Sequence, residues 1–302
     1  MSDSTSVNKS FLDPSIISRI SALDLRARLV VEGFMVGLHK SPYHGFSVEF
    51  SQHRPYMQGD NLSRVDWRVF GKTEKYFIKQ YEEETNLRSY IILDSSKSMS
   101  FASEKNVSKI DYASTLVAAL SYLMVKQQDA VSLTIYSDKI EKHLPPKSSN
   151  AYLQQILKEL TLLRTSSKTN SADSLNAIAE KIKRRGLVII ISDFFDDVDK
   201  TLKAIKHFAH LKNEVIIFQI LDPMERTFGF GKDAIFKDLE TDEELTTQPF
   251  QIQKAYQDAM NEFTNKIKRE CLNSNFDYNL IDTSTPFDKA LFSYIQKRSR
   301  LH

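Results

Sequence analysis

Oxygen-bearing side chains alternate in one short segment of the chain. Asp94, Ser96 and Ser98 directly follow the apolar run 90–93. An apolar run that ends in an acid and a hydroxyl-rich turn is typical of a buried parallel strand that delivers polar groups to the carboxyl edge of a sheet. One carboxylate and two hydroxyls, without thiol or imidazole, suit Mg²⁺, or Mn²⁺ in its place. The sequence therefore predicts a cation site after this strand.

Three ligands leave an octahedral ion in need of others, which must come from distant segments. The two best suppliers are Thr169, just before a predicted helix, and Asp193, at the end of the apolar run 187–192. Both lie at strand or helix edges that could converge on Asp94. The alternative is that residues 95–100 only cap a helix, where Ser and Asp are favoured. A second acid that ends a second buried strand favours the metal site.

Composition restricts the class of protein. A chain of 302 residues with 41% hydrophobic residues can bury a full α/β core and a smaller subdomain. Its 41 Lys and Arg against 39 Asp and Glu leave a net charge of +2 without a basic block, so nucleic acid is not expected as a partner. The lone cysteine, Cys271, excludes an internal disulfide and fits a reducing compartment. With a polar start and no apolar stretch long enough to span a bilayer, we expect a cytoplasmic protein without direct membrane insertion.

From residue 88 onward, predicted strands and helices alternate, as a doubly wound, mostly parallel α/β sheet requires. Strands are expected at 90–94, 130–136, 187–193, 215–221 and 276–281. Helices are expected at 108–126, 151–163, 171–184, 200–211, 251–271 and 286–298. The turn 137–139 predicts one antiparallel edge hairpin.

The N-terminal part of the chain has a different pattern. Asp13 can cap a helix over residues 14–37, whose apolar residues form one stripe. Short aromatic-rich strands at 45–50 and 75–81 indicate a small β subdomain, and we expect the short strands within 224–249 to pair with it. The predicted domains are 1–85, an N-terminal helix plus the β subdomain, and 86–302, the α/β domain with 224–250 inserted.

Asp-x-Ser-x-Ser, a later loop threonine and an Asp after a hydrophobic strand resemble the metal-ion-dependent adhesion site of von Willebrand factor A domains, whose sheet is Rossmann-like. The resemblance implies direct ligation by Ser96, Ser98 and Thr169. It implies that Asp94 and Asp193 act mostly through water, and that an acidic residue of a protein partner fills a free coordination position.

The chain departs from that pattern at two lysines. Ser167 and Lys168 stand where Gly-Gly is usual before the threonine, so Thr165 is the alternative to Thr169 as loop ligand. Lys97 and Lys168 replace small residues beside the proposed ion. Either both ammonium groups extend into water, or they weaken cation binding while attracting an acidic partner segment.

Charged and aromatic residues are dense before the first long strand: Arg54, Tyr56, Asp60, Arg64, Asp66 and Trp67. Together with 79–86, 221–223, 236–240 and 283–286, this segment resembles a widespread bacterial family, domain of unknown function 58, along almost the whole chain. Members of that family are typically encoded beside MoxR-type AAA+ ATPases, so the resemblance implies such an ATPase as partner. Either the charged residues form a salt-bridge network that holds the loop, with Trp67 as a packing anchor, or they form a docking surface for the partner.

Three functions fit these residues. The first is a non-catalytic, metal-ion-dependent protein-binding module that acts with the ATPase in chaperone or complex-assembly work. The second is a metal-dependent phosphoester hydrolase with Asp94 as nucleophile, although Ser96 stands where haloacid-dehalogenase-like enzymes have their acid–base Asp. The third is a structural scaffold with a vestigial metal site. A ligand set without an acid–base or nucleophilic companion favours the first.

Overall fold

The computed structural model describes residues 13–39, 53–55, 70–71, 74–79, 87–103, 106–165, 171–229, 234–237, 244–247 and 249–298. The chain divides into two compact units, Met1–Gly37 with Leu87–His302, and Leu38–Asn86. The first unit holds the α/β domain and the N-terminal helices. The N-terminal helices therefore belong with the α/β domain, whereas the predicted domain 1–85 placed them with the β subdomain.

A six-stranded sheet forms the centre of the larger unit, in the order β10-β7-β6-β3-β4-β5. All neighbouring strands are parallel except β4 and β5, which pair antiparallel. The bounds are β3 (Arg88–Asp94), β4 (Ala130–Tyr136), β5 (Ile140–Lys147), β6 (Leu187–Ser192), β7 (Glu214–Leu221) and β10 (Asp277–Asp282). The predicted doubly wound, mostly parallel α/β fold is confirmed, and so is the antiparallel edge hairpin.

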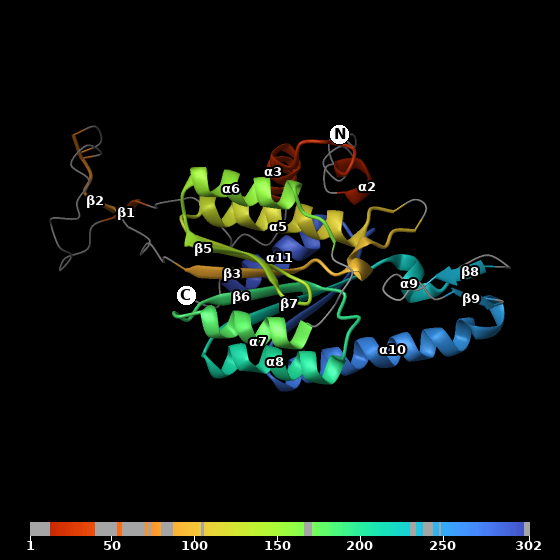
Figure 1. Ribbon diagram of the computed structural model, residues 1–302. Coiled ribbons are helices and arrows are strands. Elements are labelled where there is room, and N and C mark those ends of the chain that lie inside the picture. The colour runs from red at the N-terminus through yellow and green to blue at the C-terminus, as the bar shows by residue number, and fades with distance from the viewer. Residues whose placement is uncertain are drawn as a thin grey trace. The chain divides into compact units, whose positions relative to one another are not determined.

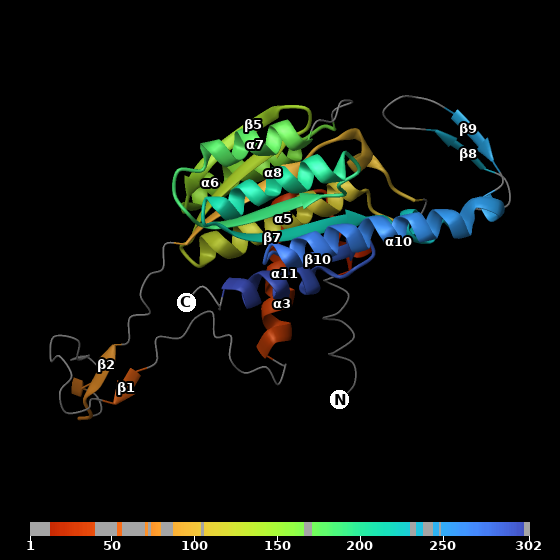
Figure 2. The ribbon, with the colours of Figure 1, turned by 90° about the horizontal axis from the view of Figure 1, so that it is seen from below.

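Helices cover both faces of this sheet, as Figures 1 and 2 show. One layer contains α5 (Lys109–Lys126), α6 (Asn150–Thr161) and α11 (Phe287–Arg298). The other layer contains α7 (Ser171–Lys181), α8 (Val198–His210) and α10 (Pro249–Asn273). Because both faces are covered, the central strands are buried along nearly their whole length, which is why they read as continuous apolar runs. Two short helices, η2 (Lys97–Ser100) and α9 (Pro223–Thr227), follow β3 and β7.

The strand order reverses between β3 and β6. From β3 the chain moves outward through β4 to β5, and from β6 it moves the other way through β7 to β10. Gly186 permits the close approach of these two strands: a Cβ at this position would lie 2.2 Å from the Arg88 carbonyl oxygen. In open α/β sheets, ligands bind outside the carboxyl ends of the strands at this reversal point.

The predicted single helix over residues 14–37 is wrong. The chain forms α2 (Pro14–Ile17), capped by Asp13, and then α3 (Leu23–His39). Arg26 explains the interruption, because its guanidinium donates hydrogen bonds to the Ile20 and Ser18 carbonyl oxygens. The hydrophobic stripe therefore keeps its helical periodicity across the turn between α2 and α3, where the Arg26 hydrogen bonds interrupt the helix.

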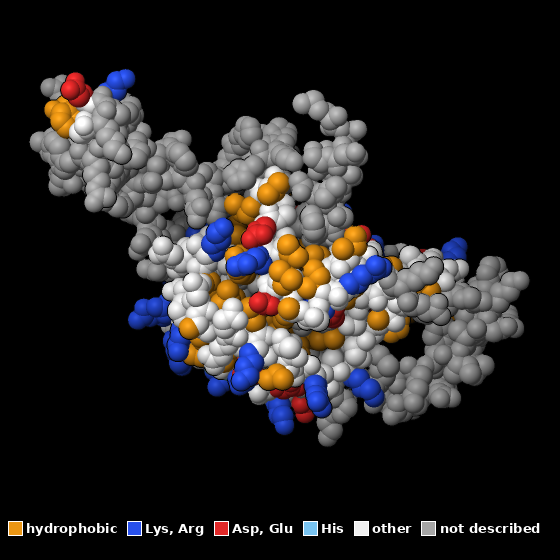
Figure 3. All heavy atoms as spheres, turned by 90° about the horizontal axis from the view of Figure 1, so that it is seen from above, with side chains coloured by type: hydrophobic (Ala, Val, Ile, Leu, Met, Phe, Trp, Pro, Cys, Tyr) orange, Lys and Arg blue, Asp and Glu red, His pale blue; other side chains and the backbone are white. Residues whose placement is uncertain are grey.

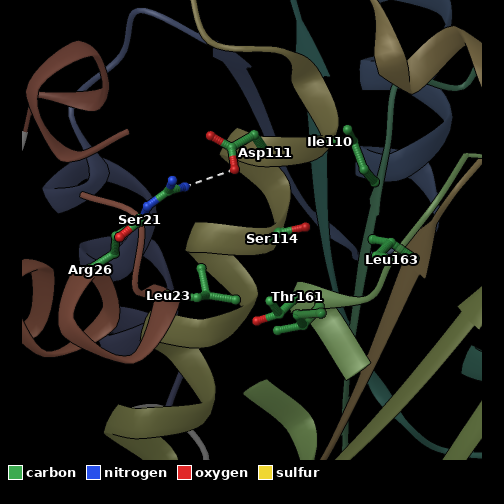
Figure 4. A pocket seen from close by; sticks show the side chains of 9 residues that line it. Ser21, Leu23, Arg26, Ile110, Asp111, Ser114, Thr161 and Leu163 are labelled. Atoms are coloured by element: carbon green, nitrogen blue, oxygen red, sulfur yellow. Dashed lines mark hydrogen bonds and ion pairs between the residues drawn. The ribbon is translucent and has the colours of Figure 1, made fainter. Parts of the chain in front are cut away.

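The same arginine fastens α3 to the α/β domain. Arg26 Nη1 lies 2.7 Å from Asp111 Oδ1 of α5, the contact drawn as a dashed line in Figure 4. A hollow of about 230 Å³ lies beside this ion pair, between the α2–α3 turn, the first turns of α5 and the end of α6. Its lining is mixed: Ser21, Leu23, Arg26, Ile110, Asp111, Ser114, Leu160, Thr161 and Leu163.

The outer surface of the α3/α6 layer carries apolar side chains among charged ones, as Figure 3 shows. The exposed large apolar residues of α2, α3 and the end of α6 are Ile16, Leu25, Val36 and Leu162. Charged side chains of both signs stand among them, with Lys and Arg more frequent in this view.

Two further hairpins are described by their backbones. β1 (His53–Pro55) pairs antiparallel with β2 (Phe77–Lys79), and β8 (Ala234–Lys237) pairs antiparallel with β9 (Glu244–Thr247). Among the described strands each hairpin pairs within itself, so a joint β subdomain stays a prediction. The strand predicted at 45–50 lies outside the described residues.

We predict that Arg26→Met lowers the free energy of unfolding by about 2 kcal/mol, because a largely buried charged hydrogen-bonding group loses contacts with α5 and with the α2–α3 turn. Urea denaturation would measure the change. The matched control is Arg28→Met, whose exposed side chain lies 3.8 Å from Glu32 and should contribute below about 0.5 kcal/mol. Equal losses in the two variants would contradict the role of Arg26.

Candidate functional site

The point where the strand order reverses brings the two predicted acids to the same edge of the sheet. Asp94 is the last residue of β3, and Asp193 directly follows the last residue of β6. The two strands pair directly, with Leu93 opposite Ile191. The structure thus places Asp94, Ser96, Ser98 and Asp193 around one strand edge, although the acids are 99 positions apart in the sequence.

The Asp94 carboxylate is buried and held by two hydrogen bonds. Its Oδ2 accepts from Ser192 Oγ at 2.5 Å, and its Oδ1 accepts from the Ser96 backbone N–H at 2.8 Å. Burial, and then the charge of Asp193, raise the pKa of Asp94 to about 7, against these two hydrogen bonds. The ionised form of Asp94 therefore lacks a full counter-charge.

The two predicted serine ligands face each other. Ser96 Oγ lies 3.0 Å from Ser98 Oγ, beside the Asp94 turn. Ser96 occupies the N-cap position of η2, but its side chain makes no capping hydrogen bond. This geometry argues against the alternative in which these serines only cap a helix, because the hydroxyl that would cap points to its neighbour instead.

Asp193 is engaged by a lysine that the sequence analysis did not single out. Lys109 Nζ lies 2.7 Å from Asp193 Oδ2 and 2.6 Å from Glu225 Oε1. The lysine is fully buried, and its ammonium also lies 4.6 Å from the centroid of the Phe195 ring. Burial by itself would lower the pKa of Lys109, but the two carboxylates raise it above its ordinary value, so the ammonium form is held.

The turn after β6 is constrained to aim Asp193 at this lysine. Phe194 adopts a positive φ of 62°, which is rare for a bulky side chain, and packs in the core. Ser192 Oγ accepts from the Phe194 N–H, and Asp193 Oδ1 accepts from the Phe195 N–H. These contacts hold one Asp193 oxygen on the backbone and leave the other for the ammonium.

Gln219, in the middle of β7, supports the same turn. Its side-chain amide donates to the Asp193 carbonyl oxygen at 3.1 Å and accepts from the Tyr278 hydroxyl at 2.5 Å. Gln219 is fully buried, so both ends of its amide require a partner. The backbone of Asp193 is thereby fixed from the neighbouring strand.

Glu225 connects the site to α9. Asp222 and Glu225 form a capping box at the start of this helix, with Glu225 Oε2 accepting from the Asp222 N–H. Asp222 in turn accepts from the Ser103 N–H and hydroxyl. Burial raises the pKa of Glu225, and the Lys109 charge only partly offsets this. One ammonium is therefore shared between two acids.

Tyr136 adds a buried polar atom beside Asp94. It is the last residue of β4 and lies opposite Asp94 in the sheet register. Its hydroxyl lies near Ser192 and Ser171 but completes no hydrogen bond within the described residues. Burial, and then the Asp94 charge, raise the pKa of Tyr136 well above its ordinary value.

The charge balance of this cluster fits a cation. The Lys109 ammonium contacts Asp193 and Glu225 but not Asp94, so the three carboxylates, when ionised, leave a formal excess of two negative charges. Hard oxygen donors around excess buried negative charge are the environment that Mg²⁺ or Mn²⁺ neutralises. Among the described residues, no group of three or more His, Cys, Asp and Glu is placed to hold a metal ion.

Several predicted residues cannot be placed. Thr169 and Lys168 lie outside the described residues; Thr165 is described and half-buried, and α7 begins at Ser171. Arg54 is described only as part of β1, and the other members of the proposed docking segment lie outside: Tyr56, Asp60, Arg64, Asp66 and Trp67. Lys97 is half-buried in η2. Their roles stay predictions.

Two supporting residues escaped the sequence reasoning for different reasons. Gln219 stands inside the apolar run 215–221, and a polar residue in a buried strand is a detectable signal. Lys109 gives no such signal, because a lysine in the first turn of a helix reads as a solvated charge. Only the tertiary structure, in which Lys109 meets Asp193 and Glu225, shows that it is buried.

A family model described as Protein of unknown function DUF58 matches residues 52–266. Among curated proteins, the chain is 23% identical over 234 residues to Uncharacterized protein Mb1516 of Mycobacterium bovis, covering 76% of this chain and 72% of that protein. The same values hold for Uncharacterized protein Rv1480 of Mycobacterium tuberculosis.

Two solved structures are similar in fold. The conserved hypothetical protein BatB from Bacteroides thetaiotaomicron matches with a TM-score of 0.48 and 16% identity, over 72% of this chain and 100% of that chain. An aerotolerance-related membrane protein from Bacteroides fragilis matches with a TM-score of 0.47 and 19% identity, over 70% of this chain and 99% of that chain. In the part of the present chain that the structure describes, no helix is long and apolar enough to cross a bilayer.

We predict that Asp94 makes the protein less stable as the pH rises through neutrality in buffer free of divalent ions. The pKa of Asp94 rises from 3.8 to about 7 on folding, so the folded state binds this proton more tightly than the unfolded chain. The stabilising contribution is full below pH 4 and is lost as the pH passes about 7, a change of roughly 4 kcal/mol.

Urea denaturation of the protein and of Asp94→Asn between pH 4 and 8, in EDTA, would measure this contribution. Asp94→Asn should lose less stability over the range and exceed the unaltered protein at pH 8. The exposed Asp24→Asn is the control and should keep the original pH slope. Parallel curves for the protein and Asp94→Asn would show that another group titrates.

Proposed function

Since the chain belongs to the family described as Protein of unknown function DUF58, we propose its function from the geometry of the site. It is a non-catalytic protein-binding module that holds Mg²⁺, or Mn²⁺ in its place, where the strand order of its sheet reverses. The observation that carries the proposal is the buried excess of negative charge around Asp94, beside two serine hydroxyls that face each other.

The residues that would hold the ion come from two strand ends and one loop. Ser96, Ser98 and Thr169 would bind the ion directly, and Asp94 and Asp193, at the ends of β3 and β6, would act mostly through water. When bound, the ion supplies a positive charge that a carboxylate of another protein can approach. The chain's own residues orient that position, and their hard oxygen donors suit Mg²⁺ or Mn²⁺ better than soft cations.

The partner contact follows from the same chemistry. An acidic side chain of the partner would complete the ion's coordination, which makes binding depend on the metal and on one Asp or Glu of the partner. Arg54, Tyr56, Asp60, Arg64, Asp66 and Trp67 are proposed as a second docking region for the same partner.

The resemblance to this family supports a proposal for the partner. We propose a MoxR-type AAA+ ATPase as the co-worker, in chaperone or complex-assembly work in the cytoplasm, with the ATPase carrying out the hydrolysis. A pull-down of the ATPase by this protein, with Mg²⁺ and with EDTA, tests the pairing. Binding that survives EDTA and loss of the serines would instead support a scaffold with a vestigial site.

We predict that Ser96→Ala/Ser98→Ala abolishes the calorimetric heat of Mg²⁺ and Mn²⁺ binding while the fold is kept, because two of the ion's ligands are removed. Ser100→Ala is the matched control: this exposed serine lies in the same turn and donates only to the Lys97 carbonyl oxygen. It should bind both ions as the unaltered protein does.

Two results would contradict the proposal. If neither the unaltered protein nor the serine variant gives a heat of binding, the protein has no metal site. Hydrolysis of a phosphoester by the purified protein, lost in Asp94→Asn, assigns the site to the hydrolase alternative.

A further inference from the structure

Lys109 is a fully buried charge at the site that has no role in the proposed function. Its ammonium is enclosed by Asp193, Glu225 and the Phe101 and Phe195 rings. Of the predicted ligands, the ammonium contacts only Asp193. The Asp94 carboxylate accepts hydrogen bonds from Ser192 and the Ser96 backbone instead. The two predicted acids therefore have separate partners.

We propose that Lys109 is a positioning residue that holds Asp193 out of direct contact with the ion, and so leaves a coordination position for the partner's carboxylate. This inference rests on the proposed function. It adds how the chain prevents Asp193 from occupying the free coordination position of the ion.

Both oxygens of Asp193 are already engaged. Oδ2 receives the ammonium at 2.7 Å, and Oδ1 receives the Phe195 N–H at 3.1 Å. Gln219 fixes the Asp193 backbone, so the side chain cannot reach the ion by a shift of the turn without breaking that contact. An acid held in this way influences the ion through its charge and through water.

The alternative is that Lys109 only neutralises buried acids and has no effect on the ion. A second lysine cluster of the same form allows the two roles to be compared. Lys297 lies 2.7 Å from Glu214 Oε2 and 2.9 Å from Asp277 Oδ2, at the amino ends of β7 and β10, which is the opposite edge of the sheet. Both clusters consist of one ammonium between two carboxylates.

The test variant is Lys109→Met/Glu225→Gln. It removes one positive and one negative charge, so the net charge of the site is unchanged while Asp193 loses its ammonium. We expect Mn²⁺ to bind about tenfold more tightly than in the unaltered protein, because a carboxylate replaces a water on the ion. Water-proton relaxation should report fewer waters on the bound Mn²⁺, and Mg²⁺ should raise the Tm more than in the unaltered protein.

Two controls accompany this variant. Glu225→Gln keeps Lys109 on Asp193 and should bind Mn²⁺ no more tightly than the unaltered protein. Lys297→Met/Glu214→Gln makes the same exchange at the distant cluster and should leave Mn²⁺ affinity and bound water unchanged. A tenfold gain in the distant variant as well would overturn the proposal, because the effect would not come from Asp193.

A further variant covers the case in which the double variant fails to fold. Asp193→Asn leaves Lys109 paired with Glu225. If Lys109 holds Asp193 away from the ion, this variant keeps the same number of waters on Mn²⁺ as the unaltered protein. One additional bound water would mean that Asp193 is a direct ligand, and the inference would fall.

The results separate this inference from the proposed function. If the unaltered protein binds no Mn²⁺, both fail. If it binds Mn²⁺, and the folded double variant binds it with the same affinity and the same water count, only the role of Lys109 fails.

Discussion

Like charge that is buried at one edge of a sheet is the constraint on which the rest of this structure depends. Parallel pairing of β3 with β6 brings Asp94 and Asp193 to the same edge, and both are almost fully buried. Carboxylates in such a place must be neutralised, hydrogen-bonded or protonated, because an uncompensated buried charge costs about 3–5 kcal/mol. The turns around the site supply hydrogen bonds or a counter-charge to these carboxylates.

The two acids are stabilised by different contacts. Asp94 is given hydrogen-bond donors without a counter-charge, from Ser192 and from the Ser96 backbone. Asp193 contacts an ammonium from α5, which it shares with Glu225, and Gln219 of β7 fixes its backbone. Asp94 thus keeps an unmet demand for positive charge, whereas Asp193 does not. This asymmetry makes Asp94 and its serines the place where a cation is most stabilising.

Lys109 also joins parts of the fold that would otherwise be independent at this edge. It contacts β6 through Asp193 and α9 through Glu225, and α9 is in turn held to the Ser103 loop through Asp222. A ligand or partner that displaced α9 would therefore change the partner of the ammonium. The positive φ at Phe194 belongs to the same network, because strained backbone persists where surrounding contacts over-determine it.

Family membership limits what the relatives can add. The Protein of unknown function DUF58 match and the mycobacterial relatives establish kinship along most of the chain. The side chains at the reversal point of the sheet carry the proposed function.

The sequence by itself determined the element types, the mostly parallel sheet and the edge at which Asp94 and Asp193 meet. Alternating apolar runs and helical stripes are local patterns, and a strand end followed by an acid is visible in a few residues. Tertiary structure decided what these patterns do not contain. Lys109 meets its two acids across 84 and 116 positions of the chain, and Arg26 interrupts a helix whose stripe continues. Such contacts depend on which surfaces pack together, so no local period records them.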